Sequence, residues 1–183
     1  MLLKKNKTAR IIADFLSYMF VMINVCVVKI LPLKLVLRMG KIFGTIAYYM
    51  AKEHRKVGYD SLRTALGKSV DEPKTVIKKC FNLMGETLFE AVYYSIRKID
   101  PTEHIQVIGQ ENLINALEKG KGVVCVTAHM GNFAVMMYGL QRYGYKTHTM
   151  LRPLKNKYVN KLVAGFMEGR QVHPIFSYPR NVT

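Results

Sequence analysis

Acidic residues are scarce in this sequence, which holds 12 Asp and Glu against 28 Lys and Arg. The formal net charge of +16 favours an anionic partner, which could be nucleic acid, an acidic membrane surface or an acidic protein. The sequence has no basic-aromatic motif, no zinc-binding pattern and no helix-turn-helix signature. Their absence argues against nucleic acid, so we expect a membrane surface or an acidic protein.

Cysteines are also few. Cys26, Cys80 and Cys125 are far apart, and each lies in an apolar segment. This pattern argues against a disulfide framework and a zinc site, and it predicts buried thiols in a reducing compartment. The sequence has neither a cluster of metal ligands nor a nucleotide-binding loop. We therefore expect neither a metal nor a cofactor.

An apolar run of 18 residues, Ile11–Val28, follows a basic amino terminus. As a helix it would be roughly 27 Å long, close to the hydrocarbon thickness of a bilayer. It is too long for the core of a signal peptide, and no cleavage site of small residues follows it. Asp14, Ser17 and Asn24 interrupt it, and basic residues flank both ends, which does not fit a simple span. We predict that residues 1–31 form a helix in, or dipping into, the cytoplasmic membrane face; a span and a buried core helix are the alternatives.

Residues 32–100 have the apolar periodicity of helices. The expected helices run from Leu33 to about Ala51, from about Arg55 to Leu66, and from Ser69 to Ile99. In the first of them, Gly40 and Gly44 have the small-xxx-small spacing of closely packed helices. In the last, an apolar stripe predicts the side that faces the core; its members are Val76, Ile77, Cys80, Phe81, Met84, Leu88 and Val92.

Residues 101–183 follow a different pattern, in which short apolar runs alternate with helical segments. The expected strands are His104–Gly109, Gly122–Ala128, Lys146–Arg152 and Val172–Phe176, and the second of them is expected to be buried. Helices are expected between them, beginning near Glu111, Asn132 and Asn156. The sequence therefore predicts an α/β fold: a helical amino-terminal region followed by a mostly parallel sheet with flanking helices.

The segment that follows the second expected strand holds the candidate catalytic residue. His129 would lie at the carboxyl end of that strand, where open α/β sheets bind ligands. Gly131 leaves the backbone accessible, and Asn132 can cap the next helix, whose free N–H groups favour developing negative charge. A histidine there can act as a general base, or it can simply donate a hydrogen bond to a loop carbonyl.

Three segments of the chain resemble the late acyltransferases of lipid A biosynthesis, the lauroyl/myristoyl transferase family. They are Lys119–Phe133 (KGKGVVCVTAHMGNF), Leu151–Val163 (LRPLKNKYVNKLV) and the weaker Gly85–Glu90 (GETLFE). The resemblance implies a glycerolipid-acyltransferase-like fold. It also implies transfer of a fatty acyl group from acyl carrier protein to a hydroxyl of a membrane glycolipid, at the cytoplasmic face of the bacterial inner membrane. Acyl carrier protein and anionic lipids are the acidic partners that the net charge would attract.

The resemblance also assigns roles. His129 would be the general base that deprotonates the acceptor hydroxyl. Arg152 would stabilise the oxyanion or bind an acceptor phosphate, and Lys155 could hold phosphate as well. Gly131 and Asn132 would contact the substrate. Glu90 matches an acidic position of the family.

Two departures from the family pattern leave further alternatives. The family motif is His-x4-acid, but here position 134 is Ala134. A carboxylate that orients a catalytic histidine can be worth about 10⁴ in rate. Family members also continue past the segment corresponding to Val172–Phe176, so we expect an incomplete sheet of about four strands. One alternative is a catalytically silent membrane-associated homologue or fragment that still binds lipid or acyl carrier protein. The other is a histidine-dependent hydrolase, which the missing G-x-S-x-G motif disfavours.

Overall fold

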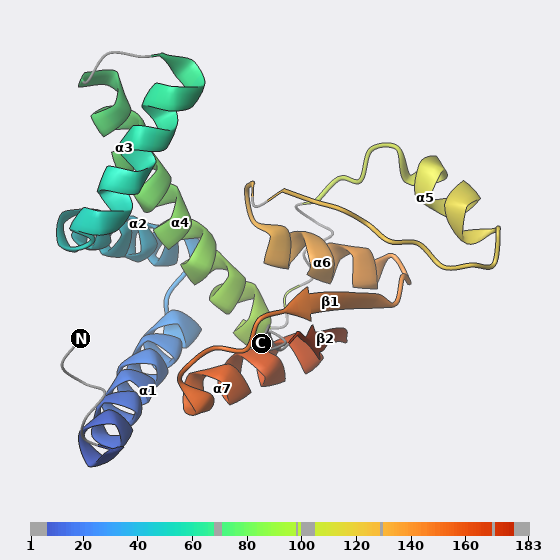
Figure 1. Ribbon diagram of the computed structural model, residues 1–183. Coiled ribbons are helices and arrows are strands. Elements are labelled where there is room, and N and C mark those ends of the chain that lie inside the picture. Colours follow the sequence, from blue (N-terminus) through green and yellow to red (C-terminus); the bar gives the residue numbers. More distant parts are fainter. Residues whose placement is uncertain are drawn as a thin grey trace, which may run out of the picture.

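The computed structural model describes residues 7–67, 71–97, 99, 105–128, 130–169 and 171–177. Its central element is the long helix α4 (Asp71–Arg97). Figure 1 shows α2 (Leu33–Met50) and α3 (Lys52–Leu66) beside its amino-terminal half, and α1 (Lys7–Ile30), α6 (Phe133–Arg142) and α7 (Lys157–Glu168) toward its carboxyl end. The four helices predicted for the first hundred residues are therefore present.

The first two helices are separated by a proline. Pro32 fixes its own backbone at φ −69° and cannot donate an amide hydrogen, so α1 ends before it and α2 begins after it. Thr8–Ile30 is, among the described residues, the one helix long and apolar enough to cross a membrane. Only 6% of its most apolar stretch is buried, which does not fit the alternative of an enclosed core helix.

The carboxyl end of α1 is held by an arginine from the end of α4. The Arg97 guanidinium donates hydrogen bonds to the carbonyl oxygens of Lys29 (2.9 Å) and Leu31 (2.8 Å), and it lies over the Tyr93 ring at 4.8 Å. A cation at this place also interacts favourably with the helix dipole of α1. The apolar helix is thus attached to the body of the protein at its last turn.

Glycines allow α2 and α4 to cross at very short range. A Cβ atom on Gly40 would lie 2.6 Å from the carbonyl oxygen of Gly85, and one on Gly44 would overlap the carbonyl oxygen of Phe81. This confirms that the spacing of Gly40 and Gly44 serves close helix packing. Gly85, within the GETLFE segment, is the matching glycine on α4.

This crossing corrects the apolar stripe predicted for α4. Ile77 is buried, but Met84 is 70% exposed and Leu88 is 63% exposed. The side that faces α2 is the one that carries Gly85, and Phe89, one turn after Gly85, is buried there. The buried α4 residues outside the predicted stripe are Pro73, Phe89, Tyr93 and Tyr94.

The remaining elements form a small α/β unit. After α5 (Gln110–Leu117) and α6 come β1 (Thr147–Leu151), α7 and β2 (Val172–Phe176). The two strands are parallel, in a register that runs from Thr147 opposite Val172 to Leu151 opposite Phe176. Helix α7 makes the crossover between them (Figure 1). The parallel arrangement predicted for these two strands is confirmed.

Two other predicted strands are wrong within the part of the chain that the structure describes. Residues 105–109 and 122–128 are irregular, and β1 pairs with β2 in a two-stranded sheet. The predicted burial of the second segment is wrong as well, since Val124 is 92% exposed and Val126 is 94% exposed. An apolar run becomes a buried strand only where other strands and helices cover it, and here none of the described elements does so.

The three cysteines are free, as predicted, but their predicted burial is wrong. Cys26, Cys80 and Cys125 are all exposed. Cys26 lies on α1, whose apolar surface is largely uncovered, and Cys125 lies in the exposed segment 122–128. Apolar neighbours in the sequence indicated burial, but next to Cys125 the neighbours Val124 and Val126 are themselves exposed.

Candidate active site

The N-cap of α6 lies three residues after the candidate base, His129, in the sequence. Asn132 is the N-cap, and its side-chain oxygen accepts a hydrogen bond from the backbone N–H of Val135 (3.2 Å), as predicted. Gly131 has φ +64°, a left-handed conformation that favours glycine. Any other residue there would be strained, although a Cβ would meet no neighbouring atom within 4 Å. His129 itself lies outside the described residues.

The same asparagine also ties this turn to α4. Its side-chain nitrogen donates to a carboxylate oxygen of Glu90 (2.8 Å) and to the backbone carbonyl of Thr87 (3.1 Å). Glu90 is the final residue of the GETLFE segment, and 42 positions separate it from Asn132. Two of the three segments that carry the family resemblance therefore meet at this point.

The end of β1 lies at the same end of the α/β unit as the start of α6. Helix α6 and strand β1 contact each other and run in opposite directions, so the start of α6 and the end of β1 fall on the side nearest α4 (Figure 1). Arg152 is the first residue after β1 and is exposed. The carboxyl ends of parallel strands are the usual location of ligand sites in α/β folds.

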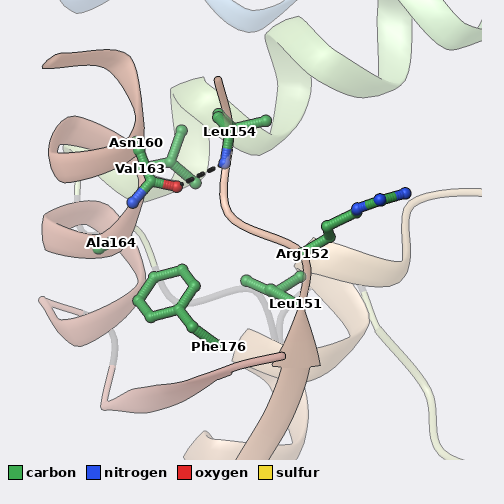
Figure 2. Close-up of a pocket in the computed structure, with 7 residues that line it drawn as sticks. All are labelled: Leu151, Arg152, Leu154, Asn160, Val163, Ala164 and Phe176. Carbon is green, nitrogen blue, oxygen red and sulfur yellow. Dashed lines mark hydrogen bonds between the residues drawn. The ribbon is translucent and has the colours of Figure 1, made fainter. Parts of the chain in front are cut away.

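A small apolar cavity lies beside Arg152, between the strand ends and α7. Figure 2 shows Leu151 and Phe176, the last residues of β1 and β2, facing α7, while the Arg152 guanidinium is directed away from the cavity. The backbone N–H of Leu154 donates to the Asn160 side chain (2.8 Å), which holds the loop against α7. At about 90 Å³ the cavity is well below the 300–1,000 Å³ of typical ligand sites, so it can hold only part of a ligand.

The loop after β1 is bound to the apolar helix α1. Asn156 caps α7 by accepting from the N–H groups of Tyr158 and Val159, and its side-chain nitrogen donates to the backbone carbonyl of Asp14 (2.8 Å). The Tyr158 ring lies 5.8 Å from the ring of Tyr18 on α1. Lys155, one residue before Asn156, is exposed. Asn156 and Tyr158 thus connect the chain that follows the predicted phosphate-binding residues to the helix predicted to meet the membrane.

Two of these contacts could not be predicted from the sequence, although the capping role of Asn156 could. An asparagine directly before a helical segment indicates a cap. The hydrogen bonds from Asn132 to Glu90 and from Asn156 to Asp14 join residues far apart in the chain, and no local pattern indicates them. Ala134, the departure from the family motif, lies in the first turn of α6 and packs against the core.

Comparison with known proteins places the chain among the enzymes that it resembles. The family model described as "Bacterial lipid A biosynthesis acyltransferase" matches residues 3–173, nearly the whole chain. Comparisons with curated proteins and with solved structures give no match. The matched range includes the helical region, the Asn132–Glu90 link, β1 and the first two residues of β2. The chain therefore belongs to the bacterial lipid A biosynthesis acyltransferase family.

Proposed function

We propose that the protein transfers a fatty acyl group from the thioester of acyl carrier protein to a hydroxyl of a membrane glycolipid, such as a lipid A precursor. The observation that carries this proposal is the family match over residues 3–173, which supports an acyltransferase of the lipid A type. The donor, the acceptor hydroxyl and the residue roles go beyond that match. They rest on the residues of the site and on its position beside α1.

In the proposed reaction His129 removes the proton from the acceptor hydroxyl as its oxygen attacks the thioester carbonyl carbon. The carbon–sulfur bond then breaks, and the proton passes to the sulfur of the departing carrier protein. The products are an ester and a free thiol. Arg152 supplies positive charge for the oxyanion or for an acceptor phosphate, and Lys155 supplies a second cation. Gly131 and Asn132 shape the turn where the acceptor binds.

The arrangement beside α1 supports a substrate that stays in the membrane. Asn156 joins the loop of Arg152 and Lys155 to the backbone of Asp14. A headgroup at the lipid surface would therefore meet both cations without leaving the bilayer. The cavity next to Arg152 offers a place for a few methylene groups of the acyl chain. We place the reaction at the cytoplasmic face of the bacterial inner membrane, where acyl carrier protein is found.

The products of a transfer assay test this proposal. Purified protein, vesicles containing a lipid A precursor and radiolabelled acyl-acyl carrier protein should yield labelled glycolipid. Labelled free fatty acid without labelled glycolipid would support the hydrolase instead. No consumption of the thioester beyond a protein-free control would support the silent homologue with Ala134. Only the first outcome agrees with the proposed function.

Membrane binding through α1 gives a second prediction. Phe15, Leu16 and Phe20 are 50% to 62% exposed, and burying one such side chain in an apolar phase contributes about 1.5–3 kcal/mol. We expect Phe15→Glu and Phe20→Glu each to lower the partition constant for anionic vesicles by at least about tenfold. Vesicle sedimentation measures this change.

The matched control is Val57→Glu on α3, where the apolar side chain is 66% exposed but lies on a different helix. Equal losses for the control and the α1 variants would contradict a specific role of α1. Salt separates the two remaining arrangements of the helix. At about 1 M salt the screening length falls to about 3 Å, so a surface-bound helix should release, whereas a spanning helix should stay.

A further inference from the structure

We infer that Glu90 is a positioning residue of the transfer reaction: its carboxylate holds Asn132, and Asn132 fixes the turn that follows His129. The inference rests on the proposed function, because it assigns Glu90 a task in the same reaction. Its structural basis is the 2.8 Å hydrogen bond from the Asn132 side-chain nitrogen to Glu90.

The orientation of the Asn132 amide is determined by its surroundings. The nitrogen has two hydrogens to donate, and it faces two acceptors, the Glu90 carboxylate and the Thr87 carbonyl. The oxygen faces a donor, the backbone N–H of Val135. Rotating the amide by half a turn would break all three hydrogen bonds. The side chain is therefore held in one orientation, with α4 on one side and the first turn of α6 on the other.

Glu90 is well suited to act as this anchor. It is half-buried on α4, where the close crossing with α2 at Gly85 holds the helix backbone. A hydrogen bond to a carboxylate is stronger than one to a neutral acceptor. A negative charge beside the first turn of α6 is also favourable, because the amino end of a helix is electropositive.

Chain connectivity carries this restraint to the candidate base. In the sequence only Met130 and Gly131 separate Asn132 from the candidate base, so we expect an anchored Asn132 to help position His129. A catalytic group displaced by about 1 Å can lose about 10²-fold in rate. At position 134, where the family pattern has an acid, the chain offers only the methyl group of Ala134. Glu90 thus brings a carboxylate to this turn from another helix.

Kinetics of two Glu90 variants test the role. Glu90→Ala removes the acceptor, so we expect kcat to fall by about 10²-fold while KM for the acyl donor stays close to that of wild type. Glu90→Gln keeps an oxygen that can accept from Asn132, and it should retain most of the activity. The matched control is Glu86→Ala, one turn earlier on α4 and also half-buried, which should leave kcat unchanged. Wild-type kcat in Glu90→Ala would overturn the inference.

An exchange of the two side chains gives a sharper test. Asn132→Asp keeps the cap on α6 but places two carboxylates against each other, so transfer should be strongly impaired. Adding Glu90→Gln restores a hydrogen bond in the reverse direction, from the new amide to the new carboxylate. We expect the double variant to recover at least about tenfold in kcat over Asn132→Asp alone. Failure to recover would overturn the direct link between the two positions.

Melting temperatures separate this inference from the proposed function. If Glu90 holds Asn132, the decrease in Tm for Glu90→Ala with Asn132→Ala together should be smaller than the sum of the single decreases. If the decreases in Tm are not additive but the protein transfers no acyl group, the proposed function and the positioning role of Glu90 are overturned. The hydrogen bond between Glu90 and Asn132 is not. If the decreases in Tm are additive and the enzyme is active, the contact between Glu90 and Asn132 is overturned and the proposed function is not.

Discussion

His129→Ala is expected to lower the rate of acyl transfer by about 10²–10⁴-fold, the usual contribution of a general base. The physical reason is the weak nucleophilicity of an alcohol, whose proton must leave as the carbon–oxygen bond forms. The alanine side chain cannot accept that proton. The initial rate with labelled acyl-acyl carrier protein at saturating donor measures the loss, and Tm shows whether the variant is still folded.

The chain provides a matched control for this change in two other histidines. His148 and His173 are exposed and adjacent on β1 and β2, with ring centroids 5.3 Å apart. Alanine at either position removes an exposed imidazole from the α/β unit, and transfer should continue at the wild-type rate. If His129→Ala transfers acyl groups at the wild-type rate, another group is the base. If His148→Ala lowers the transfer rate as much as His129→Ala does, the loss is a general effect of removing a histidine.

The helices of this protein could be predicted from sequence because their signals are local. Pro32 separates α1 from α2, and Gly67, with φ 57°, ends α3 where the sequence places a helix stop. Asn132 caps α6 as its position before an apolar helical run suggests. The spacing of Gly40 and Gly44 even indicated the close crossing, although their partner Gly85 could not be identified from spacing alone.

Other features depend on contacts between distant parts of the chain. Segment 122–128 has the composition of a central strand, but composition does not say whether neighbouring strands are in place. The burial of α4 follows from where α2 crosses it, so Leu88 fits the helical stripe and is nevertheless exposed. The candidate site shows the same limit. Asn132 was identified from its local role, whereas the partner that anchors it, Glu90, is visible only in three dimensions.

Gly85→Ala is expected to destabilise the protein by about 1–3 kcal/mol, the usual range for inserting a methyl group into a packed interface. The added Cβ would overlap the carbonyl oxygen of Gly40 and lie 2.9 Å from the backbone nitrogen of Gly44. Both atoms belong to the backbone of α2, so neither can rotate away as a side chain could. Because the added Cβ meets backbone atoms, we expect a loss at the upper end of this range, and the helix preference of alanine over glycine, about 1 kcal/mol, offsets only part of it. Thermal unfolding in detergent should show a Tm lower by about 2–4 °C for each kcal/mol.

Gly165→Ala on α7 is the matched control, because that glycine is also within a helix but a Cβ there meets nothing within 4 Å. The control should stabilise the protein by about 0.4–1 kcal/mol, so the two substitutions are expected to have opposite signs. Stabilisation by both would contradict the close crossing of α2 and α4. The crossing also bears on catalysis, since Gly85 precedes Glu90 by five residues on the same helix. Moving α4 away from α2 should shift Glu90 relative to Asn132, and transfer by Gly85→Ala should therefore decrease even at temperatures where the variant remains folded.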